Sequence, residues 1–387
     1  MILFHAIAHA LAIAGTMTWD ILWTLILGFI LSSMIQAVVR KQTIVKLLGD
    51  DKPRTIAIAA GLGIASSSCS YAAVAIARSL FRQGASFVSA MVFEIASTNL
   101  VVELGIIMAL LIGWQFTLAE FVGGPLMIIF IAILFRLFLR QKLLASAQFN
   151  SNKGLAGSME GHAAMDMSIS NNGSLGKRLV SSEGLSSVSH IFVMEVAAVW
   201  KDIVGGLLIA GAVAAWVPTT FFRSLFFVGH PLAAKLWGPM IGPIISLLSF
   251  VCSIGNVPLA AVLWNDGISF GGVISFIFAD LIIIPILLIY RKYYGTRMML
   301  FILASFYASM VAAGWLTELI FGLFGLIPST HHVAAIVPNI SFNYTTYLNF
   351  MFIILAMVLV IRFIKTGALP MLKMMGGEAS GPVGHKC

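Results

Sequence analysis

Long apolar segments recur along the chain from its first residues almost to its end, and short polar or charged stretches separate them. A helix needs about 20 predominantly apolar residues to cross the hydrocarbon core of a membrane. The chain is therefore expected to be an all-α integral membrane protein. The pattern predicts seven membrane-crossing helices, at residues 18–39, 85–112, 115–139, 190–217, 269–290, 296–324 and 345–364.

Two further apolar segments, residues 54–83 and 232–265, are interrupted by small and polar residues. The first contains the run Ser66-Ser67-Ser68-Cys69-Ser70, and the second contains the run from Cys252 to Pro258. An interruption at membrane depth leaves backbone groups without helical partners, which costs several kcal/mol per group unless protein, water or a ligand supplies hydrogen bonds. We therefore interpret both segments as broken helices that build a site.

The two broken helices belong to a sequence repeat. Residues 69–97 and 252–280 agree at ten of 29 positions at a constant offset of 183, without a gap. The agreement includes a Cys-Ser step followed by a Gly-x-Ser-Phe motif, which shared apolar composition does not explain. A duplicated membrane unit of this kind is typical of transporters.

The distribution of Lys and Arg indicates how the broken helices enter the membrane. If both turn back as re-entrant hairpins, 20 of the 23 Lys and Arg lie on one side, Arg223 and Lys235 lie on the other, and Lys201 falls within a span. If both cross, the split is 14 to 8. The positive-inside rule therefore favours two hairpins that enter from opposite sides, which makes the repeats inverted. Residues 232–251 are nevertheless long enough to cross alone.

These assignments divide the chain into six parts. The side of the N-terminus, and whether residues 1–16 span the membrane, stay open because that segment has no Lys or Arg. The linker and the C-terminus are expected in the cytoplasm because they lie on the side of the membrane that carries most of the Lys and Arg residues. The parts are an apolar N-terminal segment (1–17), membrane repeat 1 (18–140), a flexible linker (141–189), membrane repeat 2 (190–324), a loop with the last transmembrane helix (325–366) and a tail (367–387).

Composition supports the membrane assignment. The chain is 60% hydrophobic and only 10% charged, so it has too little polar surface for a water-soluble globule of 387 residues. The net charge of +8 reflects Lys and Arg at the ends of hydrophobic segments, which argues against a nucleic-acid partner and leaves membrane lipid as the surroundings. No nucleotide-binding loop of the Walker type is present, so transport would use a gradient or a separate ATPase subunit. The sequence implies no cofactor and no metal site.

The repeat identifies candidate substrate-binding residues. Cys69 and Cys252 occupy equivalent positions in the two interruptions, where two thiols would bind a soft, thiophilic solute, although cysteine also serves as a small buried hydrophobe. Ser70 and Ser253 also repeat and offer hydroxyl groups. Asn256 marks the second break, and its amide is either a substrate contact or a helix cap.

Ionisable residues at membrane depth are costly and are candidates for ion coupling. Asp280 lies in the middle of a predicted span, where its repeat partner is Ser97. Glu94 and Glu103 are nine residues apart on one predicted helix and face opposite directions, so at most one faces a shared cavity, and Glu94 lies within the repeat. A proton relay through Asp280 is one hypothesis, and the further candidates for it are Glu195 and Asp202, which share a helix face.

Several stretches resemble a predicted-permease family that includes the ArsP-type organoarsenical exporters. They are Ser68-Cys69-Ser70 with Arg82-Gln83-Gly84-Ala85-Ser86, the stretch from Ser249 to Ala260, Phe276-Ile277-Phe278-Ala279-Asp280-Leu281, and Tyr290-Arg291-Lys292-Tyr293-Tyr294-Gly295. The resemblance implies a multi-spanning permease of the inner membrane, with some relatives exporting trivalent arsenicals. The motif cysteine of the family falls on Cys69.

The chain departs from the pattern of that family at two places. Relatives tend to carry Pro-x-Cys-Ser-Cys in the first break, where this chain has Ser67-Ser68-Cys69-Ser70-Tyr71, and Thr98 stands where a proline is common. The absent second thiol puts arsenical specificity in question and leaves the permease assignment intact.

Taken together, the residues favour a secondary transporter that exports a small solute or ion through a site between the two breaks. Two other classes stay open. An intramembrane enzyme could use a transient Cys69–Cys252 disulfide. Broken helices are also compatible with a channel or with an assembly partner of other membrane proteins.

Overall fold

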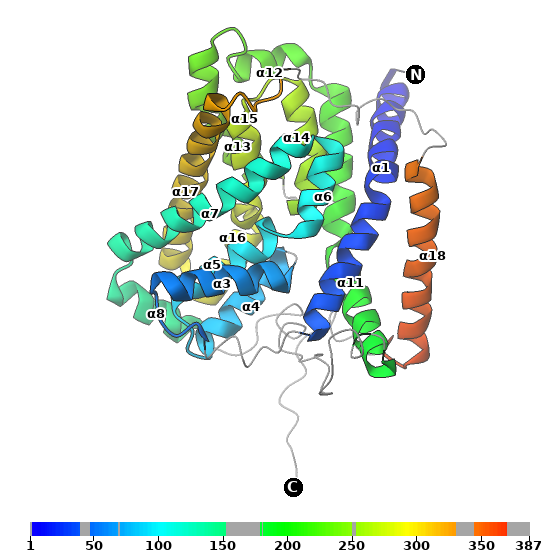
Figure 1. The fold of residues 1–387 in the computed structure, drawn as a ribbon. Helices are drawn as coiled ribbons and strands as arrows, with labels where there is room; N and C mark the ends of the chain where they lie inside the picture. Colours follow the sequence, from blue (N-terminus) through cyan, green and yellow to red (C-terminus); the bar gives the residue numbers. More distant parts are fainter. Residues whose placement is uncertain are drawn as a thin grey trace.

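The computed structural model describes residues 2–38, 47–68, 70–151, 179, 181–249, 253–329 and 344–369. Every regular element in these residues is a helix, which confirms the predicted all-α class (Figure 1). Five of the described helices are long and apolar enough to cross a membrane, and a bent pair, Phe270–Ile282 with Ile284–Tyr294, makes a sixth. The five are Phe87–Leu111, Trp114–Phe138, Pro231–Ser249, Thr296–Leu323 and Thr345–Lys365.

Three long helices pack together along one side of the molecule (Figure 1). They are α1 (Ile2–Val38), α11 (Ser182–Trp216) and α18 (Tyr344–Lys365). Asn349 of α18 donates from Nδ2 to the carbonyl of Trp19 at 2.7 Å and accepts at Oδ1 from the amide of Trp23 at 2.9 Å. Helix α1 is continuous through the boundary that the sequence analysis placed between residues 17 and 18.

Helices α3 to α7 form the first half of the rest of the molecule. Within it, one helix break lies where the sequence predicted it and another lies where none was predicted. Ser67, with φ at 38°, ends the helix that precedes the serine run. The predicted helix 85–112 is interrupted after residue 99, where Leu100 and Val101 leave the helical conformation. The helices are α3 (Pro53–Ser66), α4 (Ser70–Arg82), α5 (Phe87–Asn99), α6 (Val102–Leu111) and α7 (Trp114–Phe138).

The second half repeats these elements at the offset of 183. Helix α14 begins and ends 183 residues after α4, and α15 together with the 3-10 helix η1 covers the range 183 residues after α5. The packing repeats too, because α3 contacts α5 as α13 contacts α15, and α5 contacts α7 as α15 contacts α17. The elements are α13 (Pro231–Ser249), α14 (Ser253–Asn265), α15 (Phe270–Phe278), η1 (Ala279–Ile282), α16 (Ile284–Tyr294) and α17 (Thr296–Leu323).

The structure explains why Gly-x-Ser-Phe recurs in both halves. Gly84 and Gly267 turn the chain with φ at 108° and 99°, a conformation that glycine adopts at low cost. Two residues later, a serine caps the next helix: Ser86 accepts from an amide of α5 at 3.0 Å, and Ser269 accepts from an amide of α15 at 3.1 Å. The motif therefore positions α5, which carries Glu94 and Asn99, and α15, which leads into η1 and Asp280.

Three sequence-based expectations need correction. The predicted helix 269–290 is bent by 42° at Ile283, because Pro285 has no N–H to donate to the carbonyl of Leu281 and its ring would clash with that carbonyl in a continuous helix. The start of the linker is ordered: α8 (Gln141–Ser151) packs against α4, α16 and α17, and α11 begins at Ser182 within the residues assigned to the linker. Arg78 is buried and donates to the carbonyl of Ser151 from Nε at 3.2 Å and from Nη2 at 2.9 Å, which holds the end of α8 in place.

Candidate functional site

Two repeat-related serines meet at one carboxylate in the centre of the molecule. Ser70 and Ser253 are the first residues of α4 and α14, and their Oγ atoms lie 3.3 Å apart. Ser70 donates to Oδ2 of Asp280 at 2.7 Å, and Ser253 donates to the same oxygen at 2.6 Å. A hydroxyl has one proton to donate. Because both serines donate theirs to Asp280, the two hydroxyls are in contact but do not hydrogen-bond to each other.

Asp280 is completely buried and sits in η1, where the chain leaves the regular helix. Its other oxygen, Oδ1, accepts from Nδ2 of Asn99 at 3.3 Å. Asn99 is the last residue of α5, so groups from both halves satisfy this carboxylate. The repeat partner Ser97 has another role: its hydroxyl donates to the carbonyl of Glu94 at 2.9 Å, and its own carbonyl accepts from the amide of Ser68 at 2.9 Å.

Glu94 lies beside this centre. It is fully buried, the hydroxyl of Tyr290 donates to its Oε1, and it interacts electrostatically with Asp280. Glu103 lies on the separate helix α6, and its Cβ packs against Gly28 of α1. The structure therefore places Glu94, and not Glu103, next to Asp280.

Three residues of this centre escaped the sequence analysis. Glu120 of α7 is fully buried, neither of its carboxylate oxygens has a hydrogen-bond partner among the described residues, and it interacts electrostatically with Asp280. It is the only acid in the predicted helix 115–139, so the rule used for Asp280 would have found it. Asn99 and Tyr290 carried no comparable signal, because their partners lie 181 and 196 residues away.

Asn256 has a different place from the one predicted. Helix α14 begins at Ser253 and runs without interruption through Asn256 and Pro258. Nδ2 of Asn256 donates to Ser246 at 3.1 Å and its Oδ1 accepts from Ser249 at 3.4 Å, so its amide ties α14 to α13. The prediction that Asn256 marks the break is therefore wrong.

The remaining candidates are only partly described. Glu195 is buried on α11, a helix that packs against α14 as well as α1 and α18. Cys69, Cys252 and the side chain of Asp202 lie outside the described residues. In the sequence, the two cysteines directly precede Ser70 and Ser253.

The fold and this centre define a multi-pass, all-helical membrane protein with a buried polar site that both halves supply. A family model described as a predicted permease, ArsP_1, matches residues 6–319. The chain therefore belongs to this family of predicted permeases, as its motifs indicated.

A relative from Mycobacterium tuberculosis (strain ATCC 25618 / H37Rv), named "Putative permease Rv2963", is 64% identical over 348 residues. The match covers 90% of this chain and 86% of the relative. No solved structure matches the chain significantly.

Proposed function

We propose that the chain is a secondary transporter that exports a small solute along a path through the Ser70–Ser253–Asp280 centre. The observation that supports this most directly is the meeting of two repeat-related hydroxyls, 183 residues apart, on one carboxylate oxygen. Broken helices whose ends meet at mid-membrane are a recurrent way to build a transport site.

The proposal includes two inverted repeats, each with a re-entrant broken helix. Equal helix bounds and packing partners at the offset of 183 support a structural repeat. Helices α3, α4 and α8 lie toward one end of the molecule and α12 (Thr219–Leu225) lies at the other, which suits entry from opposite sides (Figure 1). By the positive-inside rule, the end with α8 is cytoplasmic and the end with Arg223 and Lys235 is external, in the inner membrane.

Protons are the coupling ion that the centre suits best. Asp280 and its electrostatic neighbours Glu94 and Glu120 are three acids at depth, where an uncompensated charge is costly. Protonation of Asp280 would weaken the bonds that join Ser70 and Ser253 to it, and so loosen the link between the halves. Glu195 and Asp202 stay candidates for a relay toward the surface.

The solute class is inferred from the neighbouring thiols. Cys69 and Cys252 adjoin the two serines in the sequence, and thiolates select soft cations and thiophilic species. A trivalent organoarsenical such as methylarsenite is the first probe to use.

The test reconstitutes the full-length chain in liposomes and measures uptake of methylarsenite together with proton flux. Asp280→Asn is expected to reduce both at least about tenfold, a loss of about 1.4 kcal/mol, and Ser70→Ala and Ser253→Ala to reduce both by similar factors. Glu103→Gln, a buried acid on α6, is the matched control and is expected to keep activity.

Other outcomes would contradict the proposal. Undiminished flux in Asp280→Asn would exclude this centre from the path. Ohmic current without coupling would indicate a channel, and chemical conversion without flux would indicate an enzyme. Cys69→Ser and Cys252→Ser test the thiols separately. Each substitution should reduce methylarsenite uptake more than it reduces uptake of solutes that do not bind thiols.

A further inference from the structure

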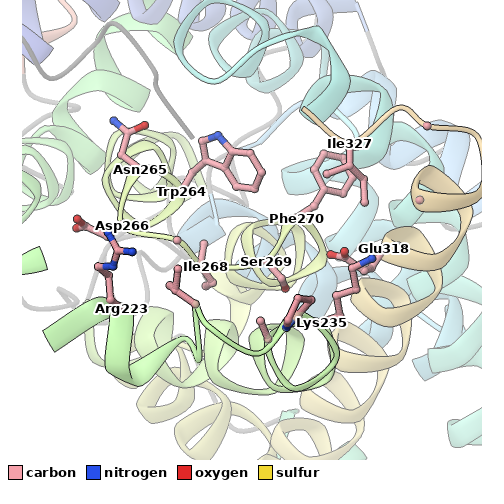
Figure 2. A pocket seen from close by; sticks show the side chains of 16 residues that line it. Arg223, Lys235, Trp264, Asn265, Asp266, Ile268, Ser269, Phe270, Glu318 and Ile327 are labelled. Carbon is pink, nitrogen blue, oxygen red and sulfur yellow. The ribbon is translucent and has the colours of Figure 1, made fainter. Parts of the chain in front are cut away.

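A polar cavity lies beside α12 (Figure 2), and α12 is at the end of the molecule opposite α8 (Figure 1). Its volume is about 750 Å³, within the range of about 300–1,000 Å³ that is typical of small-molecule sites. It is bounded by α12, the start of α13, the turn between α14 and α15, and the end of α17. The side chains that matter most are Arg223, Lys235, Asp266, Glu318, Trp264 and Phe270.

Charged side chains of both signs face this cavity. Among the described residues, the side chains of Arg223, Lys235 and Asp266 make no hydrogen bond and no ion pair within 4.0 Å. Glu318 is already used, because its Oε2 accepts from the amide of Gly271 at 2.6 Å. Partial burial raises the pKa of Asp266, in the turn between the helices, to about 6. Lys235 interacts electrostatically with Glu318, so Arg223 and Asp266 are the charged groups of this cavity without a described partner, and the Lys235 ammonium adds further donors for a ligand.

The equivalent place in the first half is filled with aromatic rings instead. Phe135 stands 183 residues before Glu318 and stacks on Phe87 with ring centroids 5.8 Å apart. Gln83 stands in place of Asp266. Lys52, the counterpart of Lys235, forms an exposed ion pair with Asp50 at 3.0 Å. The charged cavity is thus a property of the second half and not a by-product of the repeated fold.

We propose that this cavity binds an organic zwitterion, a small solute or headgroup that carries an oxyanion and an ammonium group. Arg223 and Lys235 would hold the oxyanion through charge-assisted hydrogen bonds, and Asp266 would hold the ammonium group. A ligand with one charge would gain charge-assisted hydrogen bonds from one wall of the cavity only, so it should bind less tightly than a zwitterion. This site lies beyond the proposed transport path and does not require it.

The ligand chemistry has two sources, a free solute such as taurine or the headgroup of phosphatidylethanolamine. The full-length chain is placed in nanodiscs of phosphatidylglycerol, and taurine binding is measured by calorimetry beside ethanesulfonate and ethanolamine. Taurine is expected to bind at least about tenfold more tightly than either single-charge probe. Phosphatidylethanolamine in the discs is expected to weaken taurine binding if the lipid is the natural occupant, and to leave it unchanged if a soluble solute is.

Variants locate the binding and separate it from transport. Arg223→Gln, Lys235→Gln and Asp266→Asn are each expected to weaken taurine binding about tenfold or more, because each removes one charge-assisted contact. Lys52→Gln, the repeat counterpart, and Asp280→Asn, at the other centre, are expected to bind taurine as the parent does. A monodisperse elution profile and an unchanged melting temperature show that each variant is folded.

The pH profile supplies a further readout. Asp266 holds an ammonium group only as a carboxylate, so taurine affinity should fall as the pH drops through about 6 and stay flat in Asp266→Asn. Taurine keeps both of its charges over this interval. The proposal is overturned if the parent does not bind taurine, if single-charge probes bind equally well, or if the three cavity variants bind like Lys52→Gln. Loss of transport in Asp280→Asn with intact taurine binding would leave the cavity assignment standing.

Discussion

The two serines at Asp280 make a quantitative prediction about protein stability. The perturbations are Ser70→Ala, Ser253→Ala and the double variant, each removing hydrogen bonds to Oδ2 of Asp280. The O–O distances of 2.7 and 2.6 Å fall in the range of about 2.5–2.7 Å that hydroxyls show when they donate to a carboxylate. Hydrogen bonds to charged groups contribute about 1.5–3 kcal/mol each, so with Asp280 ionised each single variant should lower the free energy of unfolding by that amount.

The double variant should cost more than the sum of the two single ones. With one serine left, Oδ2 of Asp280 keeps a donor, whereas removing both leaves that buried oxygen without a described donor, which is most costly when Asp280 is ionised. The assay is unfolding of the protein in mixed micelles, titrated with denaturing detergent and followed by circular dichroism. Asp280→Asn as background completes the cycle, because the serine substitutions should matter far less there.

The measured value also decides the protonation state of Asp280. Neutral side-chain hydrogen bonds between membrane helices average only about 0.6 kcal/mol in such cycles. A coupling above about 1.5 kcal/mol therefore indicates an ionised Asp280, and a value near 0.6 indicates a protonated one. No coupling at all, or opposite effects of the two serine variants, would refute the reasoning that both halves act on one carboxylate.

Two further predictions concern packing near this centre. Arg78→Ala removes both hydrogen bonds to Ser151 and should release the end of α8, which limited proteolysis at that helix would detect as faster cleavage than in the parent. Gly63→Ala should destabilise the protein by about 1–3 kcal/mol because an added Cβ would lie 2.5 Å from the carbonyl of Phe93, whereas Gly61→Ala, with open space around it, should stabilise α3 by up to about 1 kcal/mol. Equal melting temperatures for the two glycine variants would contradict the close α3–α5 contact.

Much of the candidate site could be predicted because a sequence repeat shows which distant residues occupy equivalent positions in the two halves. Ser70 and Ser253 were paired by their common offset, and Asp280 was selected because an acid in an apolar segment needs a reason. Neither inference required knowledge of the packing. The structure adds that both serines donate to the same oxygen of Asp280, Oδ2, which no sequence pattern indicates.

Other features could not be predicted, for identifiable physical reasons. The interruption at Leu100 and Val101 contains apolar residues only, so no glycine, proline or polar residue within it marks the break in the sequence. Helix α8 lies in a polar stretch of low hydrophobicity, and its position depends on Arg78, 73 residues earlier than Ser151. Asn256, two residues before Pro258, reads locally as a helix breaker, yet α14 passes through both, and the side-chain amide of Asn256 bonds two serines of α13.

The differences between the halves bear on how such a transporter would work. If the repeats are inverted as proposed, their exchange of conformation opens one side as it closes the other, and identical halves would give the two states equal free energy. These halves are not identical. Arg78, which holds α8 at one end, corresponds to Ala261 in the second half, while Glu318, which lines the cavity at the other end, corresponds to Phe135 in the first. Contacts that only one state can make bias the equilibrium toward it, so we expect the resting protein to be closed beside α8 and accessible at the opposite end.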